Sequence, residues 1–130
     1  MRPEVGDGSR FKSALFLVEY SHNMVTKERF NSFPPEKRYF IAASDFTRAA
    51  SFIKDRNIEM ANFEVDLGFS FLNYLFEDDP SLIGKFPTIE QCKECVKKGD
   101  YRAVYEMYLE LMELGGIPKA TVREAEKQFA

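Results

Sequence analysis

The amino-acid sequence predicts an α+β protein in which a small sheet forms first and a cluster of helices follows. Three short segments, 14–20, 38–44 and 62–71, have the composition or the alternation of β-strands. One helix is expected between the second and third strands, over residues 45–56. After Pro80, capping residues and glycines separate apolar stripes, which predicts three to four further helices.

The first two strands are predicted from their composition. The segment "ALFLVEY" (14–20) is a short apolar run with β-branched and aromatic residues, and "RYFIAAS" (38–44) resembles it. The polar stretch between them ends in Pro34-Pro35, which a helix does not cross. Apolar residues at helical spacing then predict the helix over 45–56.

The third strand is predicted from a strict alternation in "NFEVDLGFSF" (62–71). Apolar residues occupy every odd position, and polar residues or glycine occupy every even one. A period of two is typical of a strand with one buried and one solvent-facing side. The alternation places Glu64 and Asp66 on the solvent-facing side.

The helices of the second half are predicted from local signals. Thr88 and Gln91 form a capping-box pair for a helix that Gly99 closes. The next helix, 101–114, is the longest, and it has apolar residues on one face and charged residues on the other. Pro118 opens the last helix.

The length and composition are those of one globular domain. The chain has 130 residues, 45% hydrophobic and 30% charged, which is enough for a core without a metal or a disulfide. We expect a single domain over 1–130, with 1–10 as a flexible tail. No apolar run has the length of a membrane span or the pattern of a signal peptide, and the cysteine usage fits a reducing compartment, so a cytoplasmic location is expected.

The charge distribution is uneven. The net charge of −3 argues against general affinity for nucleic acid. Residues 58–80 carry six acids and no Lys or Arg, whereas residues 1–57 have ten basic and seven acidic residues and residues 81–130 have eight of each. The acidic charge is therefore concentrated in one segment of the chain.

This acidic segment also holds five aromatic residues, and aromatic anchors with charged neighbours are typical of protein interfaces. We predict a binding surface for a protein partner with a basic surface. Its charged residues are Glu64, Asp66, Glu77, Asp78 and Asp79. The alternative is internal pairing of the acids with a basic ridge of the last helix, formed by Lys119, Arg123 and Lys127 at i, i+4 and i+8. Both alternatives are open.

Two cysteines in "IEQCKECVKK" have the spacing of zinc ribbons and of thiol–disulfide enzymes. Zinc would need more ligands than Cys92, Cys95 and the single histidine, His22. Both thiols lie past the free N–H groups of the predicted helix, and Cys92 shares an apolar stripe with Ile89 and Val96. We predict reduced, metal-free and largely buried thiols. The sequence predicts no catalytic residue, no metal and no cofactor.

The C-terminal helix pair (101–129) resembles, in outline, the helix–turn–helix of DNA-binding regulators. The resemblance implies that the last helix would face the major groove with Lys119, Thr121 and Arg123. The pattern departs from that of the motif at Met112 and Gly115, and this half of the chain is electrically neutral.

The function predicted from these observations is non-catalytic binding of another macromolecule, as in small inhibitors, immunity proteins and adaptors. A DNA-binding regulator that uses the C-terminal helix pair is the alternative. An enzyme whose site forms only in the tertiary structure is the third candidate.

Overall fold

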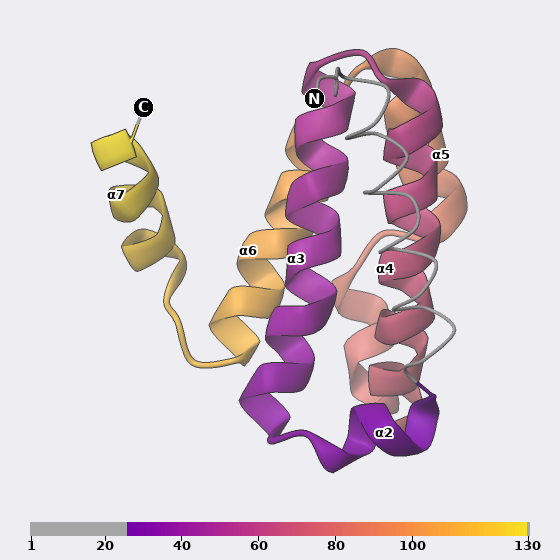
Figure 1. Ribbon diagram of the computed structural model, residues 1–130, viewed down its shortest axis with the longest axis vertical. Helices are drawn as coiled ribbons and strands as arrows, with labels where there is room; N and C mark the ends of the chain where they lie inside the picture. Colours follow the sequence, from indigo (N-terminus) through magenta and orange to yellow (C-terminus); the bar gives the residue numbers. More distant parts are fainter. Residues whose placement is uncertain (1–25, 130) are drawn as a thin grey trace, which may run out of the picture. The chain divides into compact units, whose positions relative to one another are not determined.

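The computed structural model describes residues 26–129, and all the regular elements in this range are helices (Figure 1). The chain divides into two compact units, residues 1–32 and 33–130. The predicted strand 14–20, the tail 1–10 and His22 lie outside the described residues. The single domain stays a prediction.

In the first unit, the described residues form one short helix, α2 (Lys27–Ser32). The Thr26 hydroxyl oxygen accepts a hydrogen bond from the backbone N–H of Arg29 at 3.1 Å, which satisfies a free donor of the first turn. The Ser32 hydroxyl donates to the Arg29 carbonyl. Phe30 is the buried residue of this helix.

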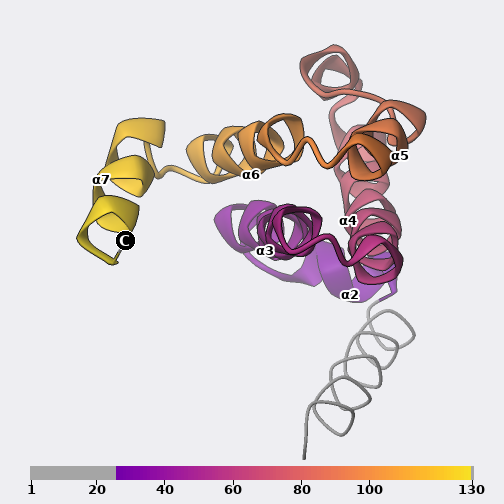
Figure 2. The ribbon, with the colours of Figure 1, turned by 90° about the horizontal axis from the view of Figure 1, so that it is seen from above.

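The described elements of the second unit are α3 (Pro35–Lys54), α4 (Ile58–Asp78), the 3₁₀ helix η1 (Pro80–Lys85), α5 (Ile89–Lys98), α6 (Arg102–Leu114) and α7 (Lys119–Phe129). Helix α3 packs against both α4 and α6, α4 also packs against η1 and α5, and α7 packs against α6. In both views, α7 lies on the outer side of α6, away from α4 (Figures 1 and 2). Within residues 26–129, no helix has the length and apolar character that a membrane span requires.

The predicted strand 38–44 is wrong, because these residues form the first half of α3. Pro35 stands in the first turn, where its missing N–H removes no hydrogen bond, so the double proline begins a helix. The buried residues Ala42, Phe46, Ala49 and Ile53 are spaced i, i+4, i+7 and i+11, as on one face of a helix. The predicted helix 45–56 is the second half of the same element, which ends at Lys54.

The predicted strand 62–71 is also wrong, because it lies within α4. The Asn57 side chain caps this helix by accepting a hydrogen bond from the Met60 N–H at 3.2 Å. The same apolar run fits a helical period: Ala61, Val65, Gly68, Leu72 and Leu75 are buried. The alternation predicts that Phe63 is buried and Glu64 is exposed. In the structure, Phe63 is half-buried and Glu64 is buried.

The predicted α+β class with a three-stranded sheet is therefore corrected to an all-α architecture for the described residues. The helices predicted from local signals are confirmed. Thr88 and Gln91 form the capping box, with hydrogen bonds of 3.1 and 2.8 Å, and Gly99 ends α5 in the left-handed conformation with a φ of 73°.

Helix α3 contacts its two neighbours at glycines. A Cβ on Gly68 of α4 would lie 2.8 Å from Cζ of Phe46, and a Cβ on Gly115 would lie 2.5 Å from Cε1 of Phe40. The Phe46 ring also meets Phe69 edge to face, with 5.5 Å between the ring centroids. The missing side chains at these two positions allow the rings of α3 to reach the backbone of the neighbouring chain segments.

We predict that Gly68→Ala lowers the free energy of unfolding by about 1–2 kcal/mol, because the overpacking at Phe46 outweighs the gain in helix propensity. Urea denaturation followed by circular dichroism measures the change. Gly84→Ala in η1 is the matched control, since a Cβ there meets nothing within 4 Å. Equal stabilities of the two variants would contradict the close α3–α4 contact.

Candidate functional site

Two carboxylates are buried in the contact between α3 and α4. The exposed fraction is 2% for Asp45 and 1% for Glu64. Asp45 lies among the small buried residues of α3, between Ala42 and Ala49, and Glu64 follows Ala61 by three positions on α4. Buried carboxylates are uncommon unless they are paired, so this pair needs a counter-charge.

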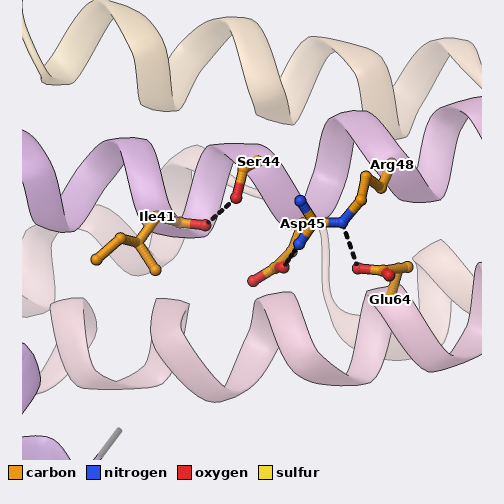
Figure 3. A network of polar contacts seen from close by, with 5 residues as sticks. All are labelled: Ile41, Ser44, Asp45, Arg48 and Glu64. Carbon is orange, nitrogen blue, oxygen red and sulfur yellow. Dashed lines mark hydrogen bonds and ion pairs between the residues drawn. The ribbon is translucent and has the colours of Figure 1, made fainter. Parts of the chain in front are cut away.

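Arg48 supplies that charge to both carboxylates (Figure 3). Its Nη2 donates to Oδ1 of Asp45, and its Nε donates to Oε1 of Glu64 at 3.2 Å. The hydroxyl of the neighbouring Ser44 donates its hydrogen bond to the carbonyl of Ile41, at 2.8 Å, and not to a carboxylate. One guanidinium therefore faces two acids, and among the described residues Oδ2 of Asp45 is buried without a hydrogen-bond partner.

When Asp45 and Glu64 are both ionised, their two negative charges face the single positive charge of Arg48, so one negative charge is left without a counter-charge. Burial raises the pKa of Asp45 to about 7; Arg48 opposes this rise, and Glu64 adds to it. Burial also raises the pKa of Glu64, against the opposing effect of Arg48. The pair therefore holds a proton over much of the range between pH 4 and pH 7.

A second polar contact joins α6 and α7. The acidic face of α6, which we define as Glu106, Glu110 and Glu113, meets the basic ridge of α7. Nζ of Lys119 lies 2.9 Å from Oε1 of Glu110, and Nη2 of Arg123 lies 3.2 Å from Oε2 of Glu106. Lys119 and Arg123 are four residues apart, and their partners Glu110 and Glu106 are four residues apart in the reverse order. The two helices are therefore antiparallel and present matching rows of charge.

The α6–α7 contact has one further hydrogen bond and one buried side chain. The Tyr105 hydroxyl of α6 donates to Oε1 of Glu126. Val122, next to Arg123 in the sequence, is 6% exposed. A small hollow of about 120 Å³ lies beside the contact, and Lys119, Glu106 and Glu110 are among its lining residues. These three groups already take part in ion pairs, so we assign no ligand to the hollow.

The acids predicted as a partner surface do not form one cluster. Glu64 is buried against Arg48, so its expected position on a solvent-facing side is wrong. Asp66 is exposed and pairs with Lys93 of α5 at 2.7 Å. Glu77 is exposed near the end of α4.

The last two predicted acids make contacts at the C-terminal end of α4. Asp78 forms a long ion pair of 3.9 Å with Arg38 of α3. The Asp79 side chain caps η1, where it accepts hydrogen bonds from the Ser81 N–H at 3.2 Å and the Ser81 hydroxyl at 2.6 Å. Internal pairing of these acids with the basic ridge was the alternative, but two of the three ridge cations pair with α6 instead.

The residues predicted for DNA binding lie on α7. Lys119 and Arg123 form ion pairs with glutamates of α6, and Thr121 is exposed. DNA binding through these residues stays a prediction, and in this arrangement two of the three side chains already have acidic partners.

The two cysteines lie on α5, as predicted, in different environments. Cys92 is buried, and its thiol donates to Sδ of Met107 at 3.4 Å. Cys95 is partly exposed, which corrects the prediction that both are largely buried. Burial raises the pKa of the Cys92 thiol to about 12, and burial and Asp100 raise the pKa of Cys95. Within residues 26–129, no three His, Cys, Asp or Glu residues are grouped as metal ligands.

Sequence reasoning missed the buried carboxylate pair. Its signal was an acid inside an apolar helical stripe, Asp45 between Ala42 and Ala49, with Arg48 one turn further on. That signal appears only when 38–54 is treated as one helix. No protein-family model matches the chain, and searches of the curated proteins and of the solved structures found no match.

We predict that the protein is more stable at pH 5 than at pH 7.5. A carboxyl group with a raised folded-state pKa stabilises the fold fully below its unfolded-state pKa, and this contribution is lost as the pH rises toward 7. The free energy of unfolding should fall by about 2–3 kcal/mol between pH 5 and pH 7.5. Urea denaturation at several pH values measures this.

Asp45→Asn should remove most of this fall and raise the stability at pH 7.5, because Arg48 then faces one ionised acid. Asp66→Asn makes the same chemical change at an exposed position and should leave the fall in place. Identical pH profiles for the wild type and Asp45→Asn would contradict the role of the buried pair.

We also predict that the two thiols react at different rates. At pH 8, a disulfide reagent should modify Cys95 well before Cys92, because Cys92 is buried and its thiolate is disfavoured. The variants Cys92→Ala and Cys95→Ala each leave one thiol and assign the two phases. Equal rates in the native protein would show that Cys92 is not shielded.

Proposed function

We propose that the protein acts by binding a protein partner with a basic surface, without catalysis, as small inhibitors, immunity proteins and adaptors do. The observation that carries the proposal is the contact between α6 and α7. The acidic face of α6 already holds a helix with cations four residues apart, at 2.9 and 3.2 Å. A surface that pairs with a basic helix of its own chain has the charge and the spacing to pair with one from a partner.

Tyr105 of α6, which adjoins the acidic face, supports the same proposal. It is half-buried, and its hydroxyl donates to Glu126 of α7. Tyrosine is enriched in protein interfaces, because the ring supplies contact area and the hydroxyl supplies a hydrogen bond. The acidic face thus has an apolar border, which charge alone does not provide.

The exposed acids of α4 and of its C-cap extend the proposal to a second surface. Asp66, Glu77, Asp78 and Asp79 are exposed, and we propose them as further charges that attract a basic partner. Glu64 is left out, because it is buried. The proposed location is cytoplasmic, since free cysteines three residues apart suit a reducing compartment.

The pKa of Asp45 would suit acid–base catalysis, but the carboxylate is 2% exposed and faces α4. A substrate would reach it only if α3 and α4 separated. The buried pair is therefore assigned to the fold and not to the proposed function.

The proposal predicts an association that depends on salt and on the acidic face. The full chain is immobilised and exposed to an extract of cells that express it, at about 50 mM and then about 300 mM salt, where screening shortens the range of exposed charges. Proteins with basic surfaces should bind at low salt and elute at high salt. Glu106→Lys with Glu110→Lys should abolish their capture.

Glu90→Lys with Glu94→Lys is the matched control, because it changes the charge equally on the exposed side of α5. This variant should retain the captured proteins, and circular dichroism checks that both variants are folded. Capture of the same proteins by the Glu106/Glu110 variant would contradict the proposal.

A further inference from the structure

The contact that holds α7 on α6 is thin. Within residues 119–127, Val122 is the buried side chain, and two ion pairs and one hydrogen bond join exposed or half-buried groups of α7 to α6. Exposed ion pairs stabilise a contact weakly, because both charges are well solvated when they are apart. Helix α7 is therefore the described helix of this unit whose docking depends most on charge.

The side of α6 that carries the contacts with α7 has a buried apolar residue next to acidic residues. Leu109 has no exposed surface and lies on the side of α6 that also carries Tyr105 and Glu106, both of which contact α7. Val104 and Leu111 lie on the opposite, core-facing side of the same helix. Release of α7 would thus uncover Leu109 between the tyrosine and the glutamates.

The connection between the two helices permits such a release. It runs over residues 115–118 and begins with two glycines. Gly116 has a φ of 106°, which side chains rarely adopt, and a Cβ there would meet nothing within 4 Å. Gly116 stands in open space, whereas Gly115 stays in contact with Phe40, so a hinge at Gly116 lets α7 swing away while α6 remains packed on α3.

We propose that α7 is an internal ligand that covers the acidic face of α6 and is displaced by a basic amphipathic helix of the partner. This inference rests on the proposed function and names the partner's chemistry. The partner helix carries two cations four residues apart with an apolar residue just before the second, as Lys119, Val122 and Arg123 do in α7. Charge complementarity with Glu106 and Glu110 selects it, and burial against Leu109 anchors it.

The test uses the full chain and a labelled peptide with the sequence of residues 118–130, followed by fluorescence anisotropy. In the wild type, α7 competes with the peptide. In Lys119→Glu with Arg123→Glu, α7 is repelled by the glutamates of α6, and the face is open. The peptide should bind this variant about tenfold more tightly, as expected when only about a tenth of the wild-type molecules have an open face.

Matched controls separate charge from displacement. Lys97→Glu with Lys98→Glu makes the same change of charge at two exposed positions of α5, which take no part in the α6–α7 contact, so it should bind the peptide like the wild type. Val122→Asp releases α7 without any change on α6 and should show the same gain as the double variant. A peptide with glutamate in place of Lys119 and Arg123 should not bind.

Equal affinity of the peptide for the wild type and for both released variants would overturn the inference, because α7 would then not compete. Equal binding of the acidic peptide would overturn it as well. If the peptide fails to bind any variant while capture of the partner still depends on Glu106 and Glu110, the internal-ligand proposal is wrong and the proposed function stands.

Discussion

The close approach of α3 to its neighbours is the constraint on which the described structure depends. Phe46 reaches the backbone of α4 at Gly68, and Phe40 reaches Gly115 at the end of α6. Because each glycine leaves the place of a side chain to an aromatic ring, the helices pack closely at these two contacts. A carboxylate buried in the α3–α4 contact then needs a counter-charge inside the protein, and Arg48 supplies it to both acids.

The carboxylate pair shows how such a contact accommodates charge. An ionised acid without a partner is costly in an apolar contact, and the α3–α4 contact holds two acids and one arginine. Arg48 keeps part of its side chain in solvent, with 46% exposed, while its guanidinium reaches both acids. Burial raises the pKa of Asp45, so the pair binds a proton in place of a second counter-charge. The stability of a contact formed mainly by apolar packing therefore also depends on pH.

The α6–α7 contact has the opposite physical character. It relies on matched rows of charge at the surface, and Val122 is its buried side chain, whereas α3, α4 and α6 share a core of buried apolar residues. Contacts that differ in this way respond to different conditions: salt weakens the first, and cavities or overpacking weaken the second. Stability is therefore distributed unevenly among the described helices, and the weakly held helix covers the surface to which we assign binding.

The acids of residues 58–80 are close together in the sequence but lie in different surroundings in the structure. The six acids look like one patch in the sequence, but a helix distributes them around its axis and along its length. Asp66 pairs with α5, Asp79 caps η1, and Glu64 is buried against α3. The basic ridge, which seemed a counterpart for this segment, is engaged by the glutamates of α6.

The sequence by itself determined the helices of the second half, because their signals are local. The capping box of Thr88 and Gln91 and the left-handed Gly99 act within one turn of chain, so no distant contact is needed to recognise them. Only the tertiary structure decided whether residues 38–44 and 62–71 form strands or helices, because the apolar residues of such a run can fit the spacing of either. Packing against other helices selected the helical period and turned Glu64 inward. Arg48 pairs with Asp45 within one helix, but it reaches Glu64 only when two distant segments meet, and for that reason the pair of Asp45 and Glu64 is a property of the fold.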